Sequence, residues 1–307
     1  MGVLAVLAPG QGAQKPGMLT DWLELPGAEP FFRWAGAIAD ADLLTLGTTG
    51  DAEAIKDTAV TQPLVVAATL LAYEELTKRG LLSGAPTVVA GHSVGEIAAY
   101  AIAGVISADD AVRLAAIRGA EMAKACAVEP TGMAAVLGGD EAEVLARLDA
   151  LDLVPANRNA AGQIVAAGAV SALDKLIEDP PAKARVRKLA TAGAFHTRYM
   201  ASALDGYAAA AERVSTNEPT TTLLSNADGQ PVTSADDAMT KLVAQLTKPV
   251  RWDLCTEYLR NGAQGPVAAI IEFPPAGTLT GIAKRELRGV PTHAVKTPAD
   301  LDGLAEL

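Results

Sequence analysis

Apolar residues along this chain form two kinds of pattern. Continuous apolar runs of four to eight residues are typical of strands buried on both faces, and apolar residues spaced three or four apart are typical of helices. Strand-like runs lie at residues 3–9, 86–91, 220–226 and 267–275. Helical patterns lie at residues 61–80, 94–105, 108–125, 236–246, 252–259 and 279–287, with a further helix starting at Tyr199. This alternation predicts βαβ units and a parallel sheet.

The middle of the chain predicts a separate, smaller unit. Three short strands are expected at residues 131–138, 162–170 and 183–190, with helices at 140–151 and 170–181 between them. Such a run of about 60 residues is typical of a two-layer insert of the ferredoxin-like type. We therefore predict a small domain at residues 129–193, inserted into a large α/β domain formed by residues 1–128 and 194–307.

Composition narrows the class of protein. With 307 residues, 50% of them hydrophobic, the chain can bury a large core. A formal net charge of −11 argues against nucleic acid as the main partner, because binding phosphates requires a basic face. Cys126 and Cys255 have no neighbouring cysteine or histidine, so we expect neither a disulfide framework nor a metal site. With no membrane span expected either, the sequence predicts a monomeric cytoplasmic protein.

One short segment carries candidate chemistry. Gly91-His92-Ser93-Val94-Gly95 fits the pattern G-x-S-x-G, with an apolar strand before it and a helical pattern after it. In this context the glycines permit a sharp turn that exposes the serine hydroxyl at the carboxyl edge of a sheet, above a helix N-terminus. A second interpretation needs no chemistry, because Ser93 and Glu96 also fit the S-x-x-E capping box. We favour the catalytic interpretation.

A nucleophilic serine requires a base, and the chain has three histidines. His92 precedes Ser93 on the tight turn, so it should point away from it and be a packed or capping histidine. His293 lies in an expected strand at residues 291–295 and is expected at the surface. His196 follows a predicted strand and precedes a helix, so by elimination it is the candidate general base. No carboxylate between Ser93 and His196 stands out as a third member. A triad and a dyad oriented by a carbonyl group are both open on this evidence.

Several motifs together resemble one family. They are residues 9–14 (PGQGAQ), 61–63 (TQP), 91–96 (GHSVGE), 118–119 (RG), 159–163 (NAAGQ), 195–196 (FH), 245–246 (QL) and 249–252 (PVRW). In this order and along nearly the whole chain, the sequence is similar to malonyl-CoA:acyl carrier protein transacylases and to the acyltransferase domains of polyketide synthases. The resemblance implies an α/β-hydrolase-like large domain with a parallel sheet, plus a small ferredoxin-like domain.

The resemblance also implies roles for individual residues. Ser93 would carry the acyl group with His196 as its base, and a carbonyl group of Gln245 would orient His196. The main-chain N–H groups of Gln11 and Val94 would form the oxyanion hole, and Arg118 would bind the malonyl carboxylate. Further substrate contacts would come from Gln62, Asn159, Gln163 and Phe195.

Three of these residues also have an interpretation that does not depend on the family. The loop at residues 9–17 lacks the third glycine of a dinucleotide loop, because Lys15 occupies that position, so it remains a turn that exposes the Gln11 N–H. Arg118 lies on an apolar helix, where an arginine more often extends to the surface. Phe195 is either a core aromatic or, as the family implies, a bulky residue that favours malonyl over methylmalonyl groups.

The expected activity is transfer of a malonyl group from malonyl-CoA to the phosphopantetheine thiol of holo acyl carrier protein, without cofactor. Because carrier proteins of this system are acidic, Arg185, Arg187, Lys188, Lys284 and Arg285 are docking candidates, with a solvated basic face as the alternative. A serine esterase or thioesterase, and a binding module in which Ser93 only caps a helix, are the rival interpretations. Residues 272–277 (EFPPAG) depart from the family's E-x-G-P-G motif. The sequence does not choose between fatty acid and polyketide synthesis.

Overall fold

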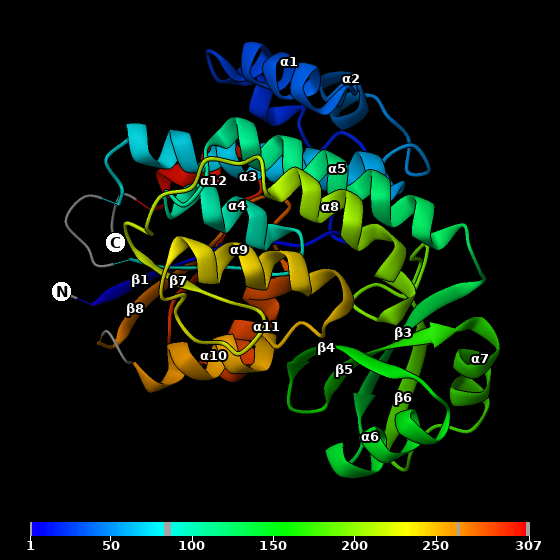
Figure 1. Cartoon of the computed structure of the whole chain (residues 1–307). Coiled ribbons are helices and arrows are strands. Elements are labelled where there is room, and N and C mark those ends of the chain that lie inside the picture. Colours follow the sequence, from blue (N-terminus) through cyan, green and yellow to red (C-terminus); the bar gives the residue numbers. More distant parts are fainter. Residues whose placement is uncertain (1, 83–86, 263–264, 305–307) are drawn as a thin grey trace.

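A computed structural model describes residues 2–82, 87–262 and 265–304. Its central element is a five-stranded, entirely parallel sheet in the order β7-β2-β1-β8-β9 (Figure 1). The strands are β1 (Val3–Ala8), β2 (Thr87–Gly91), β7 (Thr222–Leu224), β8 (Val267–Glu272) and β9 (Thr292–Ala294). Four were expected from the apolar pattern, and β9 was expected as a short strand around His293. The prediction of a parallel α/β sheet is confirmed.

Helices cover both faces of this sheet, as a parallel sheet requires. Alternate residues of β1 enter two different cores, since successive side chains on a strand point to opposite faces. Val6 packs with α3 (Thr58–Lys78), α4 (Gly95–Ile102) and α5 (Ala108–Cys126), and Leu7 packs with α10 (Trp252–Asn261) and α11 (Thr278–Glu286). Figure 1 shows these two helical layers on either side of the strands.

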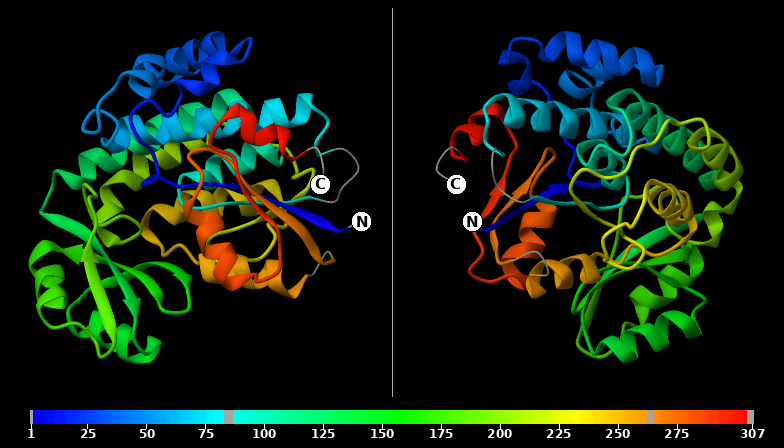
Figure 2. Two further views of the ribbon diagram at one scale, coloured as in Figure 1. Left: turned by 180° about the vertical axis from the view of Figure 1, so that it is seen from behind. Right: turned by 60° about the vertical axis from the view of Figure 1, so that its left-hand side comes forward.

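The small subdomain, residues 131–188, contains an antiparallel sheet in the order β4-β5-β3-β6. Its strands are β3 (Thr131–Gly138), β4 (Val154–Ala160), β5 (Gln163–Ala169) and β6 (Ala184–Lys188), and its helices are α6 (Glu141–Ala150) and α7 (Val170–Glu178). This β-α-β-β-α-β order is that of a ferredoxin-like fold. Figure 2 shows the subdomain beside the main sheet. The boundaries 129–193 stay a prediction.

The sequence analysis expected three strands here, and that expectation is wrong. Strand β4 was missed because its sequence, VPANRNA, contains a proline and three polar residues in place of an apolar run. The strand lies at the edge of the sheet, where a missing N–H is tolerated. Its Asn157 forms a bridge with Val250 of the large part, and Val250 N donates to Ala156 O at 2.8 Å. The missed strand therefore joins the two parts of the molecule.

The remaining helices differ in part from expectation. Helices α1 (Ala28–Ala39), α2 (Leu43–Thr48) and α12 (Pro298–Asp302) and the short 3-10 helix η1 (Asp21–Glu24) were not predicted. The helix expected from Tyr199 consists of a 3-10 turn η2 (Arg198–Ala203) followed by α8 (Leu204–Ala211). Residues 236–246 form most of α9 (Ala235–Ala244) and the turn η3 (Gln245–Thr247). In the described part of the chain, no helix combines the length and hydrophobicity needed to cross a bilayer.

Candidate active site

Ser93 lies on a sharp turn between β2 and α4. Its φ angle is 55°, in the left-handed region that residues with a side chain seldom adopt. The flanking glycines make the turn possible, because a Cβ on Gly91 would collide with the Gly95 carbonyl and one on Gly95 with the Ala8 carbonyl. The turn therefore requires glycine at both positions of the G-x-S-x-G pattern.

The structure brings Ser93 and His196 together. The Ser93 hydroxyl lies 2.7 Å from His196 Nε2, and His196 Nδ1 lies 2.8 Å from the main-chain oxygen of Gln245. A carbonyl oxygen only accepts hydrogen bonds, so Nδ1 must carry the ring proton. Nε2 is then left to accept the hydroxyl proton of Ser93. No carboxylate contacts His196 among the described residues, which makes the pair a dyad oriented by a carbonyl group.

His196 is itself held under strain. Its φ angle is 60°, so both members of the dyad occupy the left-handed region. Such conformations persist only where the surroundings fix them, and they cluster at functional sites. The turn that carries His196 is tied down by the Ala194 N–H, which donates to Thr131 Oγ1 at 3.1 Å, and by Thr197 Oγ1, which donates to Ala194 O at 2.6 Å.

Burial lowers the pKa of His196 to about 3; the positive charge of Arg118 acts in the same direction, and the hydrogen bond to Gln245 opposes it. The ring is therefore neutral at neutral pH, as a general base must be. We expect ¹⁵N NMR of the folded protein to show His196 as the neutral Nδ1–H tautomer from pH 8 down to pH 5. In denaturant the same ring should titrate near pH 6.5. Titration near pH 6.5 in the folded protein would contradict this prediction.

The capping-box interpretation of Ser93 is wrong. Helix α4 has Val94 at its N-cap without a side-chain cap, and the Ser93 hydroxyl is directed to His196. Glu96 does not reach back to Ser93; the Ser93 N–H donates to Asn226 Oδ1 at 2.9 Å instead. The Glu96 carboxylate is fully buried beneath the turn.

Arg118 points inward from α5 and is fully buried. Its Nη1 donates to Gln62 Oε1 at 2.8 Å and its Nη2 to Gln245 Oε1 at 2.9 Å. The surface interpretation of this arginine is therefore wrong. Its Nε–H has no acceptor among the described residues, although a buried donor is normally paired. The guanidinium thus keeps a donor for a further acceptor.

Two main-chain N–H groups near Ser93 complete the site. Val94 directly follows the serine at the start of α4, and Gln11 lies on the turn after the neighbouring strand β1. Neither N–H donates to a hydrogen bond within the described residues. Both lie at the carboxyl edge of the sheet, where free N–H groups can stabilise an oxyanion.

The other predicted site residues divide into two groups. Gln62 contacts both Arg118 and Gln11, its Nε2 lying 3.3 Å from Gln11 Oε1, and Phe195 is buried next to His196. Asn159 accepts a hydrogen bond from His92 Nε2 at 2.9 Å and so holds the residue before Ser93. Gln163 does not join them, because its side chain accepts from Arg285 at 2.5 Å on the protein surface.

The two remaining histidines are not bases for Ser93. The His92 ring packs against Trp252, with centroids 5.5 Å apart, and burial lowers its pKa. This confirms the expectation of a packed histidine. His293 lies on β9, as suspected, but it is half-buried, and its Nε2 is buried without a partner among the described residues. The expectation of a surface residue was therefore only partly correct.

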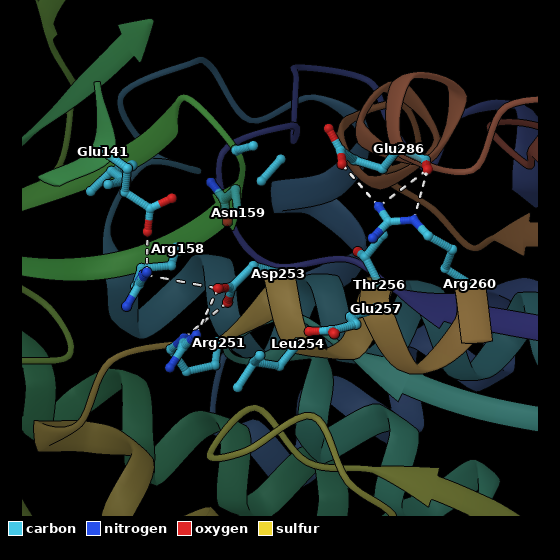
Figure 3. Close-up of a pocket in the computed structure, with 13 residues that line it drawn as sticks. Glu141, Arg158, Asn159, Arg251, Asp253, Leu254, Thr256, Glu257, Arg260 and Glu286 are labelled. Carbon is cyan, nitrogen blue, oxygen red and sulfur yellow. Dashed lines mark hydrogen bonds and ion pairs between the residues drawn. The ribbon is translucent and has the colours of Figure 1, made fainter. Parts of the chain in front are cut away.

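A pocket of about 300 Å³ opens between the small subdomain and α10 (Figure 3). Most of its charged side chains form ion pairs: Arg158 pairs with Glu141 and with Asp253, Arg251 lies 2.7 Å from Asp253, and Arg260 lies 3.0 Å from Glu286. Asn159 lines this pocket and also holds His92, so the pocket adjoins the outer side of the turn that carries Ser93.

Sequence reasoning missed Asn226, and the one role it considered for Glu96 was the capping box that it did not favour. Asn226 Oδ1 accepts from Ser93 N, and its Nδ2 donates to Gly91 O at 2.6 Å, so one side chain holds both ends of the turn. It follows β7, which is the neighbour of β2, and its position at the end of a predicted strand was the available signal. Burial raises the pKa of Glu96 to about 7, while the Asn226 N–H and the charge of Arg118 oppose the shift.

A parallel sheet that presents a serine, a neutral histidine and free N–H groups at its carboxyl edge is typical of enzymes that form an acyl-serine. The acyl transferase domain model matches residues 6–299. The malonyl CoA-acyl carrier protein transacylase of Mycolicibacterium smegmatis is 80% identical over 291 residues, which cover 94% of this chain and 100% of that protein. The chain therefore belongs to the acyl transferase family, among the malonyl CoA-acyl carrier protein transacylases.

Solved structures agree with this assignment. The crystal structure of MCAT from Mycobacterium tuberculosis is 70% identical, with a TM-score of 0.96 and 99% of each chain covered. A malonyl-transacylase solved in complex with a type II polyketide synthase acyl-carrier protein is 30% identical, with a TM-score of 0.90, and the match covers 100% of this chain and 99% of that one. The predicted combination of a parallel sheet with a small antiparallel subdomain is confirmed by these matches.

Proposed function

We infer that this chain transfers a malonyl group from malonyl-CoA to the phosphopantetheine thiol of an acyl carrier protein, with Ser93 as the residue that carries the group. The observation that supports this role best is the contact of 2.7 Å between the Ser93 hydroxyl and a histidine whose other nitrogen donates to a carbonyl group. The names of the relatives support the substrate and the acceptor.

The geometry suits a two-step transfer. In the first step, His196 Nε2 takes the Ser93 proton while Oγ attacks the thioester carbonyl of malonyl-CoA. The Gln11 and Val94 N–H groups stabilise the oxyanion. The C–S bond then breaks, and the proton passes from His196 to the departing sulfur of CoA. In the second step, His196 takes the proton of the phosphopantetheine thiol, the sulfur attacks the malonyl ester, and Ser93 recovers its proton.

Arg118 gives this reaction its preference for malonyl groups. Its buried guanidinium keeps an unpaired Nε–H, and a carboxylate is the acceptor that an arginine binds best. An acyl group without a carboxylate would leave that donor desolvated and unpaired, which is costly. Gln62 shares the guanidinium with Gln245, and Phe195 closes the core side of the site next to His196.

The carrier protein is expected to dock on a basic surface away from the dyad. Arg185, Arg187 and Lys188 lie on β6, and Lys284 and Arg285 lie in the last turn of α11. Lys188 is paired with Asp174 at 3.1 Å, and Arg285 with Gln163. Asn159 lines the pocket beside the Ser93 turn, and Gln163 contacts Arg285 at the surface. We therefore assign both residues to the entrance of the site, where the pantetheine arm or CoA would pass, and not to the malonyl group.

Following the malonyl group in an experiment distinguishes transfer to a carrier protein from hydrolysis. Mixing the protein with equimolar malonyl-CoA should add one malonyl group, which peptide mass spectrometry should locate on Ser93. Holo acyl carrier protein added next should gain that group almost stoichiometrically. Release of free malonate in its place would support a serine esterase or thioesterase. Absence of any adduct would support a non-catalytic binding module.

A further inference from the structure

Glu96 is a fully buried carboxylate that takes no part in the steps above. It lies in the first turn of α4, three residues after Ser93, and both of its oxygens accept hydrogen bonds, with the Ser225 side chain as a further partner. Oε1 accepts from the main-chain N–H of Asn226 at 2.6 Å, and Oε2 accepts from Gln245 Nε2 at 2.5 Å. Two donors on one buried group require an acceptor at both positions, which an ionised carboxylate provides.

These two donors differ in one respect. The Asn226 N–H belongs to the main chain, so it is always a donor at that position. The Gln245 side chain ends in an amide, whose oxygen and nitrogen exchange places when the group rotates by half a turn. The carboxylate of Glu96 therefore selects one orientation of the Gln245 amide, with the nitrogen toward Glu96.

That orientation determines what Arg118 meets. With Nε2 directed to Glu96, Oε1 of Gln245 faces Arg118 and accepts from its Nη2 at 2.9 Å. Nε2 also lies 3.1 Å from Asn226 Oδ1 and 3.2 Å from Ser93 O, both of which are acceptors. If the amide rotated, its nitrogen would face the guanidinium, donor against donor. Every contact of the amide is thus consistent with the orientation that Glu96 selects.

We propose that Glu96 is a positioning residue for substrate selection: by fixing the orientation of the Gln245 amide, it holds the Arg118 guanidinium in place for the malonyl carboxylate. The proposal rests on the function inferred above, since it concerns the same site. It separates two tasks of Gln245. The main-chain oxygen orients His196 whichever way the amide points, whereas the side chain orients Arg118.

Glu96→Gln tests this with almost no change of shape. The new amide must direct its oxygen to the Asn226 N–H, which leaves its nitrogen facing Gln245. The two amide nitrogens then meet donor against donor, which should displace the Gln245 side chain and weaken the contact of its Oε1 with Arg118. Because His196 keeps its carbonyl partner, acylation by acetyl-CoA should change little, whereas kcat/KM for acylation by malonyl-CoA should fall by about 10- to 100-fold. Measurement at pH 8, above the Glu96 pKa of about 7, keeps the wild-type carboxylate ionised.

Glu272→Gln is the matched control. Glu272 is also fully buried, and it accepts four hydrogen bonds, from the N–H groups of Gly277, Leu279 and Thr280 and from the Thr280 hydroxyl. It contacts no residue of the proposed site. This variant should lose thermal stability yet keep the wild-type ratio of malonyl to acetyl acylation. In Glu96→Gln, by contrast, the ratio of malonyl to acetyl acylation should itself fall.

Gln245→Met extends the test and does not depend on the folding of the Glu96 variant. It removes the amide while retaining the main-chain oxygen, and it should reduce the malonyl-to-acetyl ratio to the same extent. The double variant should lose no more discrimination than Gln245→Met alone, because Glu96 acts through that amide. A wild-type ratio in either single variant, or additive losses in the double variant, would overturn the proposal. Failure of the wild type to form a malonyl-Ser93 adduct would overturn the proposed function instead.

Discussion

Ser93→Ala should abolish malonyl transfer, with the rate falling on the order of 10⁴-fold or more. The variant removes the hydroxyl that lies 2.7 Å from His196 and that we propose as the nucleophile, while the His196 ring and the proposed oxyanion donors remain. Alanine retains the Cβ, so the strain of the left-handed turn is unchanged. Intact-protein mass spectrometry after incubation with malonyl-CoA should show no added malonyl group, and no labelled carrier protein should form.

Ser107→Ala is the matched control for this result. Ser107 is an exposed serine that caps α5, accepting from the Asp110 N–H at 3.0 Å, so its loss should cost about 1 kcal/mol of stability without affecting the dyad. It should form the malonyl adduct as the wild type does. If Ser93→Ala still acquires a malonyl group, the nucleophile lies elsewhere and the proposed mechanism is wrong.

Arg118→Lys should lower kcat/KM for malonyl-CoA about 100-fold and leave kcat/KM for acetyl-CoA nearly unchanged. Lysine keeps the positive charge, but its single nitrogen cannot reach Gln62 Oε1, Gln245 Oε1 and a substrate carboxylate together. One buried amide oxygen should then lack its donor, and stability should fall by about 1–3 kcal/mol. Kinetics with the two thioesters and a thermal melt measure both effects.

Arg113→Lys controls for the change of residue type on the same helix. Arg113 is exposed and pairs with Asp110 at 2.7 Å, an ion pair that should contribute less than about 1 kcal/mol. Its malonyl-to-acetyl ratio should equal that of the wild type. Equal losses in the Arg113 and Arg118 variants would show that general charge, and not the buried guanidinium, sets the preference.

The sequence pattern predicted local structure correctly where residues within one short segment determine that structure. The turn at Ser93 needs glycine on both sides because main-chain atoms approach there, and that requirement is visible as G-x-S-x-G. The apolar strands β1, β2 and β8 were visible because both faces of a parallel sheet are buried. Strand β4 was not visible, because an edge strand that pairs with another part of the chain needs no apolar run.

The pattern of neighbouring residues did not predict the contacts of Glu96. Its spacing from Ser93 fits a capping box, yet its partners are Asn226 and Gln245, which lie 130 and 149 residues away in the chain. Gln245 and Asn226 carry no local signal of their own for these contacts. The role of the Gln245 carbonyl was expected through the family resemblance, and not from spacing.

The amino-acid sequence alone determined the alternation of strands and helices, the glycine-flanked serine and the single histidine suited to serve it, since each depends on short-range geometry or on a small set of candidates. The tertiary structure decided which way Arg118 points, which groups surround Glu96, and that the small subdomain is joined to the large part of the molecule through β4. These depend on side chains that meet only when distant strands and helices pack together. Hydrogen-bond donors and acceptors can be matched only after packing has placed them opposite one another.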